Sequence, residues 1–158
     1  MKCGDSFEEF EMLNGISVEE FMSVFEAILE TYPMIVLANL SKNTYMMVKD
    51  DGFLADEMPK NGIYDEMIDS GVKNIHPSYQ NLFLERFSRE SLLRAFSQGK
   101  KEAFAKLYQK GRGSQYQWVS THVIRVQDKN GDVCEVCMNR ILSPESSIEN
   151  QRISGGPM

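Results

Sequence analysis

The sequence predicts an α+β protein with one five-stranded antiparallel sheet, short helices over one face of that sheet, and an N-terminal amphipathic helix. Three patterns indicate this architecture: a helix with a marked start near residue 17, two strand-like runs directly after it, and three strand-like runs after residue 99. The segment between the two groups of strands has helical character, so we expect its helices to pack on one face of the sheet. We therefore expect a half-open sheet with a core or a cavity beneath these helices.

The N-terminal part is predicted to hold a short helical lead-in over residues 1–16 and one well-specified helix over residues 17–32. Ser17 and Glu20 form a capping box, and Pro33 stops the helix because proline has no amide hydrogen. Helical spacing gives this helix one apolar stripe, made of Phe21, Val24, Phe25, Ile28 and Leu29. Such a stripe can pack on the chain's own sheet or pair with the same stripe of a second copy.

The remaining elements follow from short runs bounded by turn residues. Strands are expected at residues 34–39, 44–49, 103–110, 116–127 and 132–142, and helices at 64–70 and on either side of Ser88. Asn130-Gly131 favours a tight hairpin between the last two strands, because both residues tolerate positive φ. Ser143 and Pro144 favour a last helix, so we expect a folded domain at 17–142 and a connector helix or tail at 143–158.

Charge and composition narrow the classes of partner. A formal charge of −6 argues against nucleic acid or an anionic membrane surface, because a negative protein is repelled by both. No apolar stretch approaches the about 20 residues of a membrane-spanning helix, and the chain does not start with a signal-peptide pattern. Three irregularly spaced cysteines do not form a disulfide framework. The composition predicts a cytoplasmic globular protein with no membrane insertion.

Several short strings resemble those of the PAS family. His76-Pro77 stands ahead of a helix, as in many bacterial PAS domains. Residues 87–93 (FSRESLL) and 98–100 (QGK) resemble the family's approach to its third strand, and residues 113–119 (GSQYQWV) resemble its entry to the fourth. Residues 128–133 (DKNGDV) resemble the hairpin before the fifth strand. The likeness covers about residues 17–150 in element order, and it is poor over residues 50–73 and 140–145.

The resemblance implies a sensory, signal-input module that binds a small ligand or a partner and relays a conformational signal to an output domain. Outputs attached to PAS domains include diguanylate cyclases, phosphodiesterases and histidine kinases, so it implies a bacterial two-component or cyclic-di-GMP pathway. We expect the output to be a covalently attached neighbour or a separate partner, because no output domain is recognisable in this sequence. The resemblance also implies a homodimer through the apolar stripe of the N-terminal helix.

The ligand is expected between residues 63–98 and the sheet. Aromatic residues line most small-molecule pockets, which favours Tyr64, Phe83, Trp118 and His122 as binding residues. On the fourth strand, Trp118 and His122 share one face while Val119 and Val123 share the other. The alternation leaves open which of these two faces points inward.

The sequence offers little to hold a metal or a cofactor. His76 and His122 are its two histidines, and Cys134 and Cys137 point to opposite faces of a strand. Some PAS sensors bind haem through a histidine on the helical side, but a histidine before proline more often bonds to nearby backbone. The cysteine string that flavin photoreceptors of the family carry on a central helix is missing. We expect no metal, haem or flavin.

Two further functions stay open. The first is a protein–protein interaction or dimerisation module without a ligand, which uses the apolar stripe of the N-terminal helix. The second is a small cone-shaped α+β enzyme with His122 as general base, which requires a buried carboxylate beside His122 across the cavity. A lone histidine is weak support for catalysis, so we expect a binding module with no catalytic residue.

Overall fold

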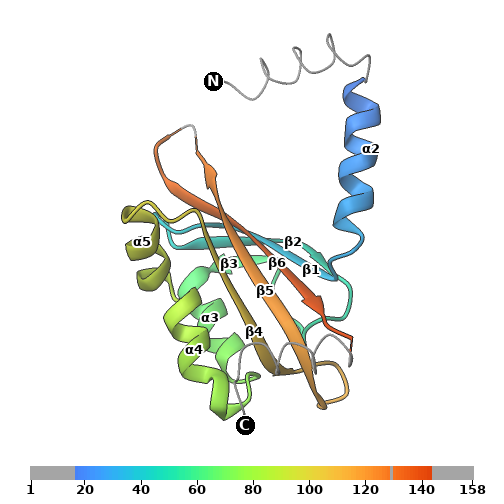
Figure 1. Ribbon diagram of the computed structural model, residues 1–158, viewed down its shortest axis with the longest axis vertical. Coiled ribbons are helices and arrows are strands. Elements are labelled where there is room, and N and C mark those ends of the chain that lie inside the picture. Colours follow the sequence, from blue (N-terminus) through green and yellow to red (C-terminus); the bar gives the residue numbers. More distant parts are fainter. Residues whose placement is uncertain (1–16, 129, 144–158) are drawn as a thin grey trace, which may run out of the picture. The chain divides into compact units, whose positions relative to one another are not determined.

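The computed structural model describes residues 17–128 and 130–143 (Figure 1). The chain divides into two units between Tyr32 and Pro33. The first unit contains helix α2 (Val18–Leu29). The second contains, in chain order, β1 (Met34–Asn39), β2 (Thr44–Asp50), β3 (Asn61–Ile63), α3 (Tyr64–Val72), α4 (Pro77–Phe87), α5 (Arg89–Ser97), β4 (Glu102–Lys110), β5 (Tyr116–Gln127) and β6 (Val133–Ile141). The lead-in expected at 1–16 and the connector expected after Ser143 lie outside the described residues.

Helix α2 begins as its capping box predicts. The Ser17 hydroxyl accepts a hydrogen bond from the Glu20 amide at 3.1 Å, and the helix ends at Leu29, ahead of Pro33. No residue of α2 is buried. None of the helices among the described residues is long and apolar enough to cross a membrane.

The strands form one antiparallel sheet in the order β3-β2-β1-β6-β5-β4. β1 and β6 are neighbours at its centre, with Met34 opposite Asn139 and Val36 opposite Cys137. The leading pair and the trailing trio of strands predicted from the sequence therefore belong to one sheet. The β1–β2, β2–β3, β4–β5 and β5–β6 ladders join consecutive strands, whereas the β1–β6 ladder joins the first strand of the unit to its last.

The sheet has one strand more than the five expected. β3 pairs with β2 through Gly62 opposite Tyr45, in a segment that has helical rather than strand character in the sequence. A Cβ on Gly62 would lie 3.1 Å from the Tyr45 ring, so glycine permits this close approach. The Tyr45 hydroxyl also donates to the Pro59 carbonyl at 2.9 Å. These two contacts hold a three-residue edge strand that carries no alternating apolar pattern.

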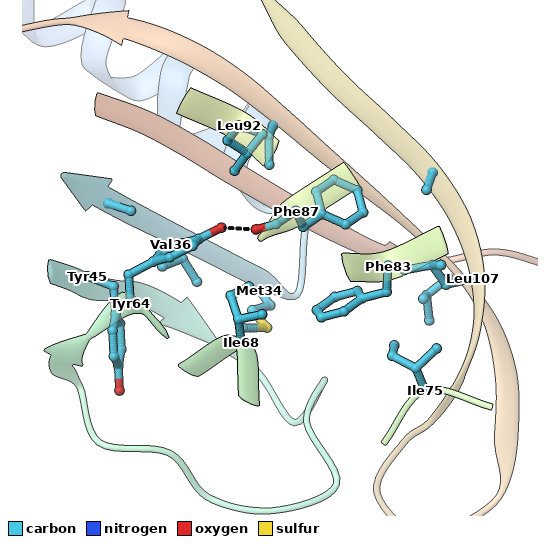
Figure 2. Packing of buried hydrophobic residues seen from close by; sticks show 14 of the residues in the cluster. Met34, Val36, Tyr45, Tyr64, Ile68, Ile75, Phe83, Phe87, Leu92 and Leu107 are labelled. Atoms are coloured by element: carbon cyan, nitrogen blue, oxygen red, sulfur yellow. Dashed lines mark hydrogen bonds between the residues drawn. The ribbon is translucent and has the colours of Figure 1, made fainter. Parts of the chain in front are cut away.

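Helices α3, α4 and α5 lie together on one side of the sheet (Figure 1). Strand alternation points Val36, Leu107, Val119 and Val123 at these helices, and all four are almost fully buried. The helices contribute Ile68, Phe83, Phe87, Leu92 and Phe96 to the same cluster. Figure 2 shows part of this cluster between the two layers, with Val36 and Leu107 of the sheet and Ile68, Phe83, Phe87 and Leu92 of the helices. Burial of this apolar surface is the main stabilisation of the unit.

The start of α4 is attached to the edge strand β4. His76 caps α4 by accepting a hydrogen bond from the Ser78 amide at 3.1 Å, with Pro77 in the first turn. The His76 amide donates to the Tyr108 carbonyl at 2.8 Å, and Ile75 bridges to Gln109 at the edge of β4. The α3–α4 connection is thereby tied to the edge of the sheet.

Candidate functional site

A cavity of about 70 Å³ lies between the inner face of the sheet and α3, α4 and the loop after β2. The helices and the loop supply an apolar wall, which includes Phe53, Leu54, Met58, Tyr64, Met67, Ile68, Phe83 and Phe87. Met34, Val36 and Val123 extend this apolar lining onto the sheet. A space of this size holds several waters or a small organic molecule, since one water needs about 10–15 Å³ measured the same way.

The sheet wall of the cavity also carries polar side chains. Gln109, Thr121, Glu135 and Asn139 come from three adjacent strands, and all four are buried. The Thr121 hydroxyl donates to Asn139 Oδ1 at 2.8 Å, and Asn139 Nδ2 donates to Cys137 Sγ at 3.4 Å. The cavity is therefore apolar on the helix side and carries both apolar and polar side chains on the sheet side; a few polar groups in an apolar lining give a small-molecule site its orientation and specificity.

Glu135 is the most unusual of these groups. Its side chain is 1% exposed, and neither carboxyl oxygen has a hydrogen-bond partner within the part of the chain that the structure describes. Burial raises the pKa of this carboxyl to about 8, because the charged form loses its hydration, and the neighbouring Tyr64 hydroxyl offsets part of the rise. Glu135 is therefore mostly protonated at neutral pH in the absence of a ligand.

Cys137 and Tyr64 are held in the same environment. Burial raises the pKa of the Cys137 thiol well above its usual range, and the Glu135 carboxyl adds to this rise. Burial likewise raises the pKa of the Tyr64 hydroxyl, again with Glu135 as the next contribution. Both groups keep their protons at physiological pH, so neither is an activated nucleophile or a base in its resting state.

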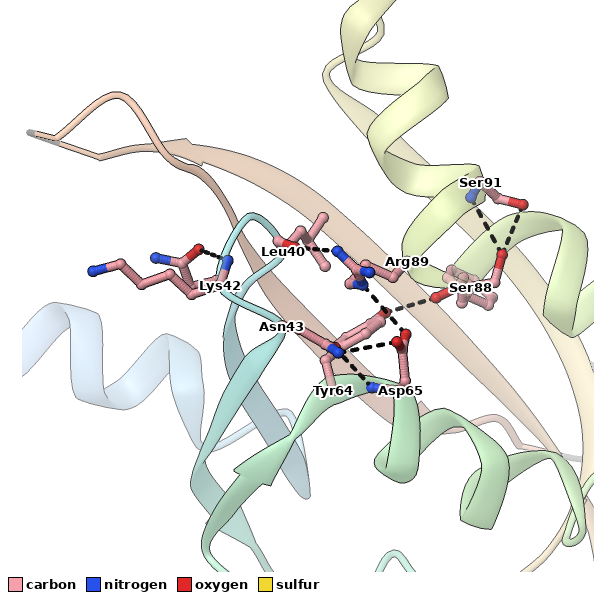
Figure 3. A network of polar contacts seen from close by, with 10 residues as sticks. Leu40, Lys42, Asn43, Tyr64, Asp65, Ser88, Arg89 and Ser91 are labelled. Carbon is pink, nitrogen blue, oxygen red and sulfur yellow. Dashed lines mark hydrogen bonds and ion pairs between the residues drawn. The ribbon is translucent and has the colours of Figure 1, made fainter.

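A polar network holds Tyr64 in place at the start of α3. Its hydroxyl donates to the Phe87 carbonyl at 2.7 Å (Figure 2). Asn43, in the β1–β2 turn, bonds through its side chain to the amide and to the carboxylate of Asp65, each at 3.0 Å. Arg89 lies 3.4 Å from the same carboxylate and donates to the Leu40 carbonyl at 3.1 Å (Figure 3). The network joins the turn, α3 and α5 around one wall of the cavity.

The structure brings two of the four predicted ligand-binding residues to the cavity. Tyr64 and Phe83 line it, whereas Trp118 and His122 do not. Thr121 and Val123 are on the cavity face of β5, so alternation places Trp118 and His122 on the opposite, outer face. The sequence had left the choice of face open, and the small residues rather than the large aromatic ones point inward.

The outer face holds an aromatic cluster at the edge of β4. Trp118 packs against Tyr79 and Tyr108, with ring centroids 5.4 and 5.1 Å apart, and Tyr108 stacks on Tyr116 at 5.2 Å. The His76 ring lies 5.1 Å from that of Tyr116. His76 thus caps a helix through Nδ1 and packs outside the cavity, which agrees with its expected bonding to nearby backbone.

His122 pairs with a carboxylate, but on the outside of the sheet. Its Nε2 lies 2.8 Å from Glu102 Oε2, and the Glu102 side chain is 64% exposed. The buried carboxylate of Glu135 belongs to the other face, so the histidine–carboxylate arrangement that the enzyme hypothesis requires is absent from the described residues.

The predicted dimer stripe occupies α2 as expected from its spacing. Val24, Phe25 and Ile28 are 58%, 45% and 55% exposed, while Phe21 and Leu29 are half-buried. Cys134 and Cys137 stand on opposite faces of β6, as alternation predicts, and only Cys137 lines the cavity. Within residues 17–128 and 130–143, no three histidine, cysteine, aspartate or glutamate side chains gather in the geometry of a metal site.

Sequence reasoning missed the polar wall of the cavity. Glu135 and Asn139 alternate with Cys134, Val136 and Met138 on β6. This pattern favours the apolar residues as the buried face, but the structure turns Glu135 and Asn139 inward. The usable signal was the spacing of Glu135 and Asn139, which lie four residues apart on the last strand and therefore share one of its faces.

The arrangement is similar to that of sensory proteins of known structure. A sensory box histidine kinase/response regulator from Burkholderia thailandensis has a TM-score of 0.51 and 13% identity, over 82% of this chain and 93% of that one. The N-terminal domain of a diguanylate cyclase with a PAS/PAC sensor from Marinobacter aquaeolei has a TM-score of 0.46 and 14% identity, over 71% and 96%. The PAS domain of an HTR-like protein from Haloarcula marismortui has a TM-score of 0.38 and 16% identity, over 79% and 100%. The sequence matches no protein-family model and no curated protein.

An antiparallel sheet with helices over one face and an apolar cavity between the layers defines a half-open α+β fold. The likeness to the Burkholderia structure, over most of both chains, identifies this fold more narrowly. The chain has the PAS fold, as the motifs predicted.

Proposed function

We propose that this protein is a sensory input module, in which a small molecule binds between the sheet and α3–α4 and changes how the ends of the domain pack. The observation that carries the proposal is the cavity itself, which places four buried polar side chains on one wall of an otherwise apolar space. Protein cores rarely leave a buried carboxylate such as Glu135 without a partner, and ligand sites are where such groups gather.

A route for the signal begins at two residues of the cavity wall. Met34 and Asn139 face each other across β1 and β6, and both line the cavity. Met34 directly follows Pro33, where the second unit begins, and Asn139 stands near the end of the last strand. A ligand that binds one packing of these ends better than another shifts their equilibrium, typically by ~1–3 kcal/mol.

The module would pass this signal to an output domain in the bacterial cytoplasm. The sensory box histidine kinase/response regulator from Burkholderia thailandensis has a similar fold. This likeness supports a signalling output such as a histidine kinase, either attached to this chain or binding it. Binding is favoured over catalysis because Glu135 and His122 lie on opposite faces of the sheet.

The ligand is neither haem nor flavin. A cavity of about 70 Å³ is smaller than the engineered cavity of about 150 Å³ that holds a single benzene ring, and both cofactors are many times larger. We expect the purified protein to have no visible absorption band. A haem or flavin spectrum at stoichiometric intensity would contradict this part of the proposal.

Self-association through α2 is a second role of the chain, with or without a ligand. Its support is the exposure of Val24, Phe25 and Ile28 on a helix that has no buried residue. Exposed apolar residues at helical spacing suit an isologous contact, in which the same stripe of two copies is buried.

Native mass spectrometry of the purified chain tests the proposed function, with two variants of Gly71 as a matched pair. Gly71 lines the cavity from α3, and a Cβ added there meets Phe83 at an ordinary 3.5 Å. Gly71→Leu extends further into the cavity and fills it, whereas Gly71→Ala adds a single methyl group.

We expect the wild type and Gly71→Ala to retain a small molecule that is released on denaturation, and Gly71→Leu to carry none. Retention of the same molecule by Gly71→Leu would place it outside the cavity and contradict the proposal. Circular dichroism of the three proteins verifies that the helix and sheet content is unchanged.

A further inference from the structure

Glu135 lies on the cavity wall without a compensating charge. Its neighbours in the sheet register are Ala38 on β1 and Arg125 on β5. Arg125 is exposed, its guanidinium donates to the Phe96 carbonyl at 3.4 Å, and it stands over the Phe96 ring at 5.9 Å. Of the ion pairs formed among the described residues, none includes Glu135. Arg125, the cation opposite Glu135 in the β5–β6 register, therefore contacts Phe96 rather than the Glu135 carboxyl.

The other polar neighbours of Glu135 supply no positive charge. The Tyr64 hydroxyl gives its hydrogen to the Phe87 carbonyl, and the Cys137 thiol accepts from Asn139. Burial raises the pKa of both groups, so both stay neutral. An ionised Glu135 is costly here unless a cation enters the cavity with the ligand.

The opposite wall is suited to the short apolar body of such a ligand. Phe53, Phe83 and Phe87 line the cavity with aromatic side chains, which favour contact with an aliphatic group when water is excluded. Met58 and Met67 add flexible, polarisable side chains that adapt to a small aliphatic group. The volume of about 70 Å³ restricts the ligand to a handful of non-hydrogen atoms.

We propose that the cavity recognises a small primary amine, with its ammonium group on the Glu135 carboxylate and its aliphatic body against the phenylalanine and methionine side chains. This inference rests on the proposed ligand-binding function and names the chemical class of the ligand. An ammonium offers three N–H donors, which satisfy the two carboxyl oxygens that have no partner in the free protein.

The proton that Glu135 carries in the free protein makes the affinity for an amine depend on pH. Below pH about 8 the free protein holds a proton on Glu135, so binding of an ammonium releases that proton to solvent. The affinity for an amine therefore falls as the pH is lowered, by up to about tenfold per pH unit. The affinity for a neutral ligand that accepts a hydrogen bond from the protonated Glu135 carboxyl would instead rise as the pH is lowered.

The test compares isobutylamine with isobutanol, which share the aliphatic body and differ in charge. Binding is followed through the methionine methyl NMR signals of the full chain, with Met58 and Met67 as cavity reporters and the half-exposed Met46 on the outer face as internal control. The wild type, Glu135→Gln and Gly71→Leu are titrated at pH about 8 and about 6.

We expect the wild type to bind isobutylamine at least about tenfold more tightly than isobutanol at the higher pH, and to lose most of this preference at the lower pH. Glu135→Gln should bind both probes with equal, weak affinity, and its binding of isobutanol shows that its cavity is intact. Gly71→Leu should bind neither.

Equal binding of both probes by the wild type, or a preference for isobutanol that grows at low pH, would overturn the amine proposal and leave the ligand-binding function standing. Absence of any cavity shift with either probe, in a wild type that is folded, would overturn both proposals. An amine preference that survives in Glu135→Gln would show that another group holds the charge, and would also overturn the assignment.

Discussion

Strand alternation sets the chemistry of single residues in this protein. Glu135, Cys137 and Asn139 share the face of β6 that meets the helices, so a buried carboxyl and a buried amide flank a partly buried thiol. The same residues on the outer face would be hydrated and would titrate normally. At Glu135 the result is a carboxyl that gains from being neutral, with a pKa of about 8.

This pKa predicts how Glu135→Gln changes stability with pH. The carboxyl titrates near 4.5 in the unfolded chain and near 8 in the folded one, so ionisation between these values favours unfolding. The free energy of unfolding of the wild type should fall relative to that of Glu135→Gln as the pH rises from about 4.5 to about 8, by up to about 5 kcal/mol, and the difference should then level off.

Urea denaturation of both proteins at a series of pH values measures this difference. Glu102→Gln is the control, because it makes the same substitution on the outer face of the sheet, beside His122. Gln109→Glu is not suitable as a control, because it adds a new charge to the cavity. A constant difference between wild type and Glu135→Gln across the range would show that Glu135 is ionised in the folded protein.

Residue positions were only partly predictable from the sequence. Tyr64 and Phe83 line the cavity, because they lie on helices that cover the sheet, and their role in binding a ligand stays a prediction. Trp118 and Glu135 lie on strands with mixed residues on both faces, where alternation groups residues but does not say which group points inward. On β6 the more polar group is the buried one, which is the reverse of the usual preference.

Among the secondary-structure elements, those with strong end signals formed where the sequence predicts them. Ser17 caps α2, and Ser88 caps α5 by accepting a hydrogen bond from the Ser91 amide at 3.2 Å. The strand β3 was not predicted, because its pairing depends on the contact of Gly62 with the Tyr45 ring rather than on a local apolar pattern. Local signals therefore predict where helices start better than they predict where edge strands form.

Ser88 offers a test of the capping argument, since α4 ends and α5 begins at this residue. Ser88→Ala should lower the free energy of unfolding by about 1 kcal/mol, because the first turn of α5 loses its side-chain acceptor. Ser88→Asp keeps the acceptor and should retain most of that stability. Thermal or urea unfolding measures both changes, and the exposed Ser78→Ala in α4 serves as control. A neutral Ser88→Ala would show that Ser88 does not stabilise the start of α5.

Phe25 tests the role proposed for α2. Phe25→Glu places a charge in the middle of the exposed stripe, so it should shift any dimer toward monomer while the fold persists. Ser23→Glu adds the same charge to α2 outside the stripe and should leave the mass unchanged. Light scattering of the three proteins at equal concentration gives the answer. An unchanged mass for Phe25→Glu would remove the dimer proposal.

At the scale of the whole molecule, the pairing of β1 with β6 joins the two groups of strands into one sheet. The order of elements and the PAS motifs were enough to predict this arrangement from the sequence. For the cavity, the sequence predicted only its location, between the helices and the sheet. Its volume and its polar wall depend on how all the side chains pack together, and single-residue patterns carry no information about that.

Xenon NMR tests most directly whether this cavity is open to a small molecule, because xenon enters apolar cavities whatever the natural ligand is. We expect a xenon chemical-shift change with wild-type protein that is clearly larger than the change with Gly71→Leu, and near wild-type behaviour for Gly71→Ala. Equal changes for wild type and Gly71→Leu would mean that xenon does not enter the space between α3 and the sheet, and would contradict a ligand site there.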